Sequence, residues 1–348
     1  MQPRSPRPPA SAATVRSVTS ADPRDPGSLP YQPVDRDPRT PWHTFGPLAP
    51  YLLRDGVTDL FVNGAGELWT DGGPRGLRRL DGWHADERST RELAVRLVAR
   101  GGRHIDEATP FVDVRLQGGV RVHAVLPPVS TGGTLLSIRI PNPHRVRLPD
   151  LVAAGSITTA QQAVLQRAIA SRTNLLVTGA GGAGKTTLLA ALLSHAPPTE
   201  RLVIIEDVAE LRIDHPHVVG LQTRQANLEG AGAVDLRRLV REALRMRPDR
   251  LVLGECRGAE VSDLLSALNT GHDGGAGTLH ANSLADVPAR LEALGALAGM
   301  PERALARQAV SAIGLVIHVE REGALRRAAD FGRLVEREGR LGVVAYDG

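Results

Sequence analysis

Gly179-Ala180-Gly181-Gly182-Ala183-Gly184-Lys185-Thr186-Thr187 is the stretch of this 348-residue chain that decides its fold. It matches the complete phosphate-binding pattern G-x-x-x-x-G-K-[ST]. The glycines allow backbone N–H groups to point inward around phosphate oxygens, and a helix that begins here adds partial positive charge. Thr186 supplies a hydroxyl suited to a magnesium ion. We therefore predict a nucleotide site to which the whole quoted stretch contributes.

Lys185 is unusual for this chain. It is the single lysine among 42 basic residues, and all the others are arginines. An ammonium is a compact point charge, whereas a guanidinium is a planar fork. The exception predicts that this position needs the smaller group because it enters a phosphate cradle.

Apolar runs and helical patterns alternate around this loop. Strands are expected at residues 174–178, 202–205, 218–223, 251–253, 277–280 and 315–319. Helices are expected at residues 185–193, 235–246, 259–268 and 284–297. Such alternation is typical of a mostly parallel sheet with helices on both faces. We therefore predict an α/β domain over residues 151–348.

A smaller α/β domain is expected over residues 46–140, with strands at 57–62, 67–70, 111–116, 120–125 and 134–140. Ser89, with Glu92 three residues later, predicts a capping box for a helix whose apolar face includes Leu93, Leu97 and Val98. Prolines near the end of this region indicate a linker over residues 141–150.

Residues 1–45 are rich in Pro, Arg, Ser and Asp and lack aliphatic periodicity, which predicts a disordered tail. Two interpretations remain for it: a solvated extension without a specific role, or a mildly basic segment that touches a membrane or a partner.

The composition excludes several classes of protein. A hydrophobic fraction of 42% with 3% aromatic residues indicates a globular chain with few stacking platforms for single-stranded nucleic acid. The 42 basic and 38 acidic residues nearly balance, so the charge does not indicate a nucleic-acid face. Cys256 is the one cysteine, which rules out an intramolecular disulfide and a cysteine-rich zinc site. We find no run suited to a signal peptide or a membrane span, and expect a cytoplasmic protein with at most peripheral membrane contact.

Carboxylates follow two of the expected strands. Glu255 comes after the strand at 251–253 and is predicted to lie at the carboxyl edge of the sheet, where a carboxylate can activate water. The alternative is a solvated glutamate at a strand end. Glu206, Asp207 and Glu210 follow the strand at 202–205, and they either hold magnesium through water or begin a polar loop.

Two histidines flank a glycine-rich segment. His272 and His280 are eight positions apart, which is not a helical metal-ligand spacing, so a zinc site is not expected. We predict that they contact phosphate as neutral donors, the alternative being a structural role.

Four motifs follow one another in an order that resembles the type II/IV secretion ATPase superfamily and, within it, the Tad/Flp pilus assembly ATPase branch (CpaF-like or TadA-like). They are the phosphate loop, IEDVAEL at 205–211, GECRG at 254–258 and GHDGGAGTLHAN at 271–282. They correspond to the family's Walker A, Asp box, Walker B and His box. Residues 62–64, 102–107, 112–116 and 121–128 are similar to that branch's N-terminal domain. The resemblance thus extends over residues 57–321.

The resemblance implies a RecA-like P-loop ATPase domain behind the smaller N-terminal domain. It implies hydrolysis of ATP with Mg²⁺ by a cytoplasmic ring, a hexamer, at the inner face of the membrane. The motor would power Tad/Flp-type pilus assembly or type II/IV protein secretion through an inner-membrane platform protein.

The resemblance also assigns roles to individual residues. Those outside the phosphate loop are Glu255 for water activation, Glu206 and Glu210 for support of the metal beside Thr186, His280 as a γ-phosphate sensor, and His272 in nucleotide binding. Arg121 and Arg139 of the first domain would reach the γ-phosphate at the domain interface. Without the family they are ordinary strand-edge charges.

The chain departs from the family pattern at three places. Ala183 stands where serine is common, Cys256 where an aliphatic residue is usual, and Gly275-Ala276-Gly277 makes the His box more flexible. A small buried packing role is expected for Cys256.

Two rival functions remain open at this level. One is a nucleic-acid-translocating or conjugation-type RecA-like motor, against which the scarce aromatic residues and balanced charge argue. The other is an assembly scaffold that binds ATP without turnover. Nucleic acid is not expected as a partner.

Overall fold

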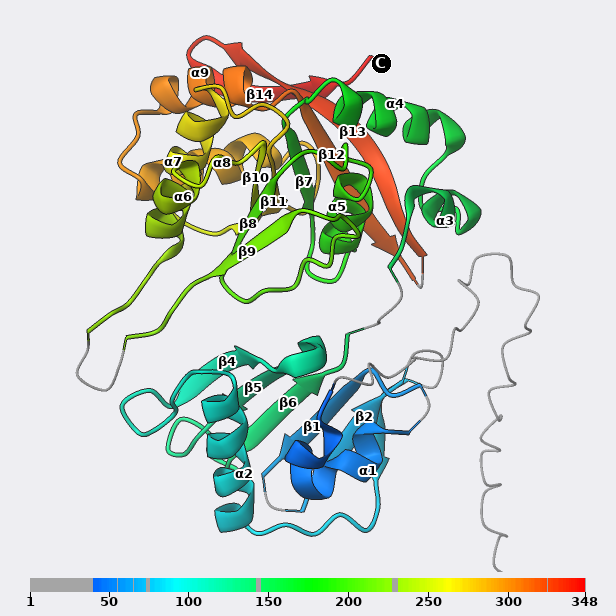
Figure 1. Cartoon of the computed structure of the whole chain (residues 1–348), viewed down its shortest axis with the longest axis vertical. Helices are drawn as coiled ribbons and strands as arrows, with labels where there is room; N and C mark the ends of the chain where they lie inside the picture. Colours follow the sequence, from blue (N-terminus) through cyan, green and yellow to red (C-terminus); the bar gives the residue numbers. More distant parts are fainter. Residues whose placement is uncertain are drawn as a thin grey trace, which may run out of the picture.

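The computed structural model describes residues 40–347 except 55, 65, 73–75, 142–144, 227–230 and 324. Two sheets form two layered domains, one above the other in Figure 1. Most of the expected tail lies outside the described residues. Its expected end at residue 45 differs from the structure, because Trp42–Leu48 forms a 3-10 helix whose Phe45 is fully buried in the core of the first domain.

The first domain is a six-stranded antiparallel sheet with strand order β3-β2-β1-β6-β5-β4. Its strands are β1 (Asp59–Asn63), β2 (Leu68–Asp71), β3 (Arg78–Leu80), β4 (Phe111–Arg115), β5 (Arg121–Val125) and β6 (Leu135–Arg139). Alternate residues of β1, β5 and β6 are buried, as expected for a sheet with one covered face. A short helix α1 (Ala49–Leu52) precedes the sheet.

Helix α2 (Glu87–Arg100) packs its apolar face, with Leu93, Leu97 and Val98, into this core. The expected capping box is wrong, because the helix begins two residues before Ser89. The side chain of Asp86 accepts a hydrogen bond from the Ser89 N–H at 2.7 Å and is therefore the N-cap.

The second domain confirms the predicted mostly parallel sheet. Its strand order is β14-β13-β12-β7-β11-β10-β8-β9, in which β12 through β9 are parallel and β13 and β14 add an antiparallel edge. The strands are β7 (Leu175–Gly179), β8 (Leu202–Glu206), β9 (Val218–Gln222), β10 (Arg250–Cys256), β11 (Ala276–His280), β12 (Leu315–Glu322), β13 (Leu325–Arg337) and β14 (Arg340–Ala345).

Helices cover both faces of this sheet (Figure 1). On one face lie α3 (Leu148–Ala153), α4 (Thr159–Ala170) and α5 (Lys185–Leu193). On the other lie α6 (Leu236–Leu244), α7 (Glu260–Leu268), α8 (Val287–Leu297) and α9 (Glu302–Ala312). Within the described ranges, no helix is long and apolar enough to span a membrane.

The elements β3, α1, α3, α4, α9 and the long β13–β14 hairpin were not predicted from the sequence. Charged residues interrupt the apolar pattern of β13, which holds only a few buried residues in its length, so the strand depends on pairing with β12 and β14. Part of the expected linker lies outside the described residues, and its end at residue 150 falls inside α3, which begins at Leu148.

Candidate nucleotide-binding site

The phosphate loop connects β7, which is buried along its whole length, to the first turn of α5. Gly179 has φ +149° and Gly184 has φ +100°, values that favour glycine. A Cβ on Gly179 would also overlap the carbonyl oxygen of Val319 in β12. The loop is therefore held in a strand–turn–helix context, which leaves the helix N-terminus open as an anion cradle.

Lys185 lies against this loop with only 8% of the residue exposed. Its ammonium donates to the carbonyl oxygens of Gly179 at 2.9 Å and Ala180 at 3.0 Å. Burial lowers the pKa of Lys185, and the negative charge of Glu255 works in the opposite direction. The ammonium thus lies against the backbone of the phosphate loop, where the charge of Glu255 acts on it.

Glu255 lies near the carboxyl end of β10, as predicted, and it is bound by an arginine that the sequence reading passed over. Arg257 donates to Glu255 Oε2 from Nε at 2.6 Å, and its Nη2 lies 2.5 Å from the same oxygen. Between them, Cys256 is buried, which confirms its packing role, and burial raises the pKa of its thiol. A signal was present, because residues two apart at a strand end point to the same side.

Glu206 ends β8 and is 7% exposed. Its Oε1 accepts the backbone N–H groups of Glu210 at 2.8 Å and Leu211 at 2.9 Å. Burial raises the pKa of Glu206, and the two N–H groups oppose that shift. A Cβ on Gly254 would lie 2.6 Å from Glu206 Cγ, so glycine at 254 lets β10 carry Glu255 past this carboxyl group.

The donor set fits a magnesium ion that keeps most of its water. Thr186 lies half-buried in the first turn of α5, and Glu206 has its second oxygen outside the two backbone hydrogen bonds. The described residues contain no group of three or more His, Cys, Asp or Glu that could enclose a metal. A site with few protein ligands is the kind that Mg²⁺ uses beside phosphates.

The two histidines lie at opposite edges of the sheet. His280 ends β11 directly opposite Gly179 of β7, and its Cε1 would lie 3.8 Å from a Cβ on Gly181, so it joins the phosphate loop. His272 precedes β11, at the amino edge of the sheet, and its Nδ1 lies 3.2 Å from the carbonyl oxygen of Ala267. Because the loop is at the carboxyl edge, the structure does not bring His272 to the nucleotide site of its own chain, and its role in nucleotide binding stays a prediction.

The first domain reaches the loop after β8 with arginines. Arg121 forms an ion pair with Glu210, Arg115 donates to the carbonyl oxygen of Ala209, and Arg103 donates to that of Asp207 at 3.3 Å. In return, Arg212 donates to the carbonyl oxygen of Gly118. Glu210 is thus occupied by an arginine of the first domain, and the predicted metal support from it competes with this ion pair.

Arg139 stands beside Arg121, since the two are register partners on β6 and β5. It is 69% exposed and pairs with Asp59 of β1 at 2.8 Å. Its charge acts on Arg326 of β13, a residue that lies on the phosphate loop. Arg121 therefore contacts the loop after β8 through Glu210, whereas Arg139 is bound within the first domain by Asp59.

Asp113 of β4 binds Arg121, the residue that pairs with Glu210 across the domain interface. Burial works against its ionisation, but hydrogen bonds from His123 and Arg121 outweigh burial and hold the pKa of Asp113 well below its usual value. Because the folded-state pKa lies below the unfolded one, the stabilisation is present above about pH 4 and is lost as the pH falls toward the folded pKa.

Asp113→Asn is expected to destabilise the first domain at pH 7 by on the order of 1 kcal/mol. The difference in the free energy of unfolding between the variant and the wild type should be smaller at pH 3, where Asp113 of the unfolded wild type is protonated. All three tryptophans, at 42, 69 and 83, lie in this domain, so urea unfolding followed by tryptophan fluorescence measures it. An equal difference in the free energy of unfolding at pH 7 and pH 3 would contradict the lowered pKa of Asp113.

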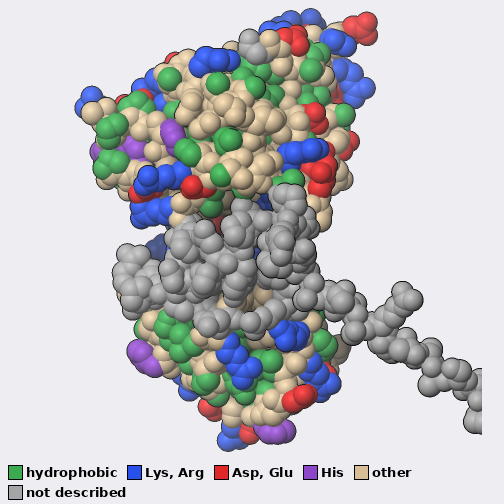
Figure 2. Space-filling model, turned by 90° about the vertical axis from the view of Figure 1, so that its right-hand side faces the viewer, with side chains coloured by type: hydrophobic (Ala, Val, Ile, Leu, Met, Phe, Trp, Pro, Cys, Tyr) green, Lys and Arg blue, Asp and Glu red, His purple; other side chains and the backbone are tan. Residues whose placement is uncertain are grey.

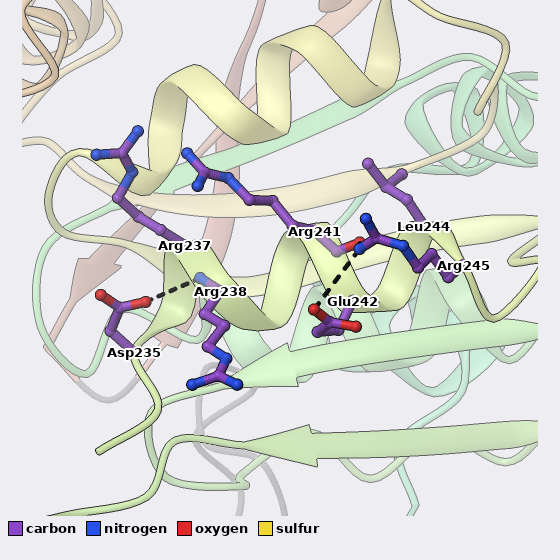
Figure 3. A pocket seen from close by; sticks show the side chains of 7 residues that line it. All are labelled: Asp235, Arg237, Arg238, Arg241, Glu242, Leu244 and Arg245. Atoms are coloured by element: carbon purple, nitrogen blue, oxygen red, sulfur yellow. Dashed lines mark hydrogen bonds and ion pairs between the residues drawn. The ribbon is translucent and has the colours of Figure 1, made fainter. Parts of the chain in front are cut away.

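A surface hollow of about 710 Å³ lies over α6, lined by Asp235, Arg237, Arg238, Arg241, Glu242, Leu244 and Arg245 (Figure 3). Arg237 and Arg241 each bind Asp263 of α7 at 2.8 Å, and Arg245 lies 3.6 Å from Glu242. Acids therefore neutralise much of this arginine row. On the face in Figure 2, basic and acidic side chains are likewise interspersed, which agrees with the balanced charge of the sequence.

Comparisons with known proteins agree with this architecture. The family model described as type II/IV secretion system protein matches residues 43–322. A putative conjugal transfer protein of Mycobacterium tuberculosis is 51% identical over 306 residues, which are 86% of this chain and 87% of that protein. The type IV secretion system protein PtlH of Bordetella pertussis is 35% identical over 324 residues, or 81% of this chain and 92% of that protein. The X-ray structure of the Legionella pneumophila ATPase DotB shares the fold, with a TM-score of 0.57 and 21% identity over 89% of this chain and 81% of its own.

A complete phosphate loop between β7 and α5 of a mostly parallel sheet, with Glu255 beside it, defines a P-loop ATPase with a RecA-like core. The match over residues 43–322 makes the attribution specific. The chain belongs to the type II/IV secretion system protein family.

Proposed function

We propose that this protein is a ring-forming, Mg²⁺-dependent ATPase motor that powers Tad/Flp-type pilus assembly or type II/IV protein secretion. The observation that carries the proposal is the convergence of Lys185, Glu255 and His280 at the phosphate loop, with the first domain's arginines bound to the adjacent loop after β8. A motor needs this arrangement, because the hydrolysis site must be joined to a part that can move.

In this proposal the chain's own residues divide the work. Gly179 to Thr187 hold the phosphates through backbone N–H groups, and Lys185 neutralises charge on the β- and γ-phosphates. Glu255, once released from Arg257, orients the attacking water and accepts its proton. His280 lies where it reports the γ-phosphate. Thr186 and Glu206 would hold Mg²⁺, which when bound would neutralise charge on the phosphate oxygens.

The placement of the arginines supports the proposal of a ring. Arg121 is held by Glu210, and Arg139 by Asp59. Exchange of these partners for a γ-phosphate, in the same chain or a neighbour, would stabilise transition-state charge and turn one domain against the other. A homo-oligomer, proposed as a hexamer, would then act from the cytoplasmic face on an inner-membrane platform protein, with peripheral membrane contact.

A conjugation-type motor is the second candidate, and the M. tuberculosis relative's name, a putative conjugal transfer protein, favours it. The acids that bind Arg237 and Arg241 weaken α6 as a nucleic-acid surface, so we place the translocating version of that motor second.

One experiment separates these candidates. Phosphate release by the full chain is measured with Mg²⁺ or EDTA, over a range of protein concentrations, and with either phosphatidylglycerol vesicles carrying a pilus platform protein or single-stranded DNA. We expect Mg²⁺-dependent turnover that rises with ring assembly and is stimulated by the vesicles. Stimulation by DNA alone would replace the secretion motor with a nucleic-acid motor, and binding without turnover would leave an assembly scaffold.

A further inference from the structure

Arg326 of β13, in the C-terminal hairpin that β12 and β13 form, contacts the phosphate loop at Gly182, 144 positions earlier in the chain. Its Nε donates to the carbonyl oxygen of Gly182 at 3.0 Å. Its side chain also runs along Gly184, where an added Cβ would lie 3.0 Å from Arg326 Cδ. Gly182 and Gly184 both have positive φ, at +72° and +100°. One arginine thus touches the two glycines whose backbone conformation shapes the cradle.

The hairpin gathers positive charge at this rim. Arg321 of β12 is the register partner of Arg326, which places both on one side of the hairpin. Both are exposed, and the ion pairs among the described residues include none to either. Desolvation by neighbouring atoms lowers the pKa of the Arg326 guanidinium, and the like charges of Arg321 and Arg139 lower it further.

Such a cluster carries an energetic cost in the absence of an anion. The like charges of the cross-strand partners Arg321 and Arg326 repel each other, and this cost is offset when a multiply charged anion lies between the two guanidinium groups and the cradle. The N-terminus of α5 and Lys185 attract the same anion from the other side. The cluster is therefore complementary to a polyphosphate.

We propose that Arg326 is a nucleotide-positioning residue: it fixes the Gly182 carbonyl, which keeps the neighbouring N–H groups turned into the cradle, and with Arg321 it adds positive charge at the rim for a nucleoside di- or triphosphate. This inference rests on the proposed ATP site. It assigns to the C-terminal hairpin a share of nucleotide affinity.

Arg326→Ala is expected to weaken equilibrium binding of a fluorescent N-methylanthraniloyl-ATP by about 10-fold. KM for ATP should rise in parallel while kcat stays within about twofold, because the residue acts on binding and not on the attacking water. Arg326→Lys should recover part of the affinity through its charge and donor, and Arg326→Gln, which has a donor without charge, should recover less.

Arg327→Ala is the matched control. Arg327 is the next residue along β13, faces the other way and binds Glu322 at 2.9 Å. The Arg327→Ala variant should bind the fluorescent ATP analogue with the affinity of the wild type, and circular dichroism should show that all variants are folded.

Wild-type affinity in Arg326→Ala, an equal loss in Arg327→Ala, or a fall in kcat at constant KM would each overturn the inference. If the wild type binds the analogue but releases no phosphate, the proposed function fails. The binding comparison between the two arginines then still decides the role of Arg326.

Discussion

Lys185→Arg is expected to lower ATPase activity by about 100-fold or more, because one preorganised donor at a transition-state charge has about this effect. The ammonium lies between the carbonyl oxygens of Gly179 and Ala180 with 8% of the residue exposed. A guanidinium keeps the charge, but its planar fork does not reproduce the contacts that a compact ammonium makes with the carbonyl oxygens and the phosphates. Phosphate release and the melting temperature are the two measurements.

The control for this substitution is Arg303→Lys, the reverse exchange at an exposed position of α9. It should change neither activity nor stability. If Lys185→Arg keeps near-normal turnover, the single lysine is an accident of composition and the phosphate loop does not need a compact charge. If its melting temperature falls sharply, the loss of activity reports misfolding instead.

Glu255→Gln should abolish turnover while ATP binding remains, with kcat reduced by about 10²- to 10⁴-fold, the usual range for a general base. The amide is nearly the same size and keeps the backbone of β10 in place, but it cannot accept a proton from water. The substitution also breaks the ion pair with Arg257. Because the phosphate loop itself is unchanged, nucleotide affinity should stay within a few fold of the wild type, measured with the fluorescent analogue beside a phosphate-release assay.

Glu302→Gln, at an exposed glutamate in the first turn of α9, is the matched control and should behave as the wild type. Retained turnover in Glu255→Gln would exclude Glu255 as the general base and leave Glu206 as the candidate. Loss of binding together with turnover would instead make Glu255 a structural partner of Arg257.

Much of the site was predictable because it is local in sequence. The segment 179–187 contains its own strand end, glycine turn and helix start, so the loop and α5 appear where the pattern places them. Glu255 and His280 lie at the carboxyl ends of β10 and β11, and parallel strands end at one edge, so both arrive at the loop. His272 does not join them, because its position before β11 puts it at the opposite edge of the sheet.

The remaining parts depend on contacts between distant segments. Arg257 reaches back to Glu255, and Arg121 crosses from the first domain to Glu210. No periodicity in the chain encodes which exposed arginine meets which acid, because in a sequence with 42 basic residues nearly every charged side chain has several possible partners. Long-range packing makes the choice.

By itself, the sequence determined a phosphate loop, a mostly parallel sheet around it and the order of the motifs. Glycine turns, apolar periodicity and the position of the single lysine can all be read from residues that are neighbours in the chain. The tertiary structure alone decided which charges complete the site. It placed Arg326 against Gly182, from 144 positions away, and it held the loop after β8 against the first domain. The physical reason is that a hydrogen bond or ion pair depends on distance in space, which the folded sheets set.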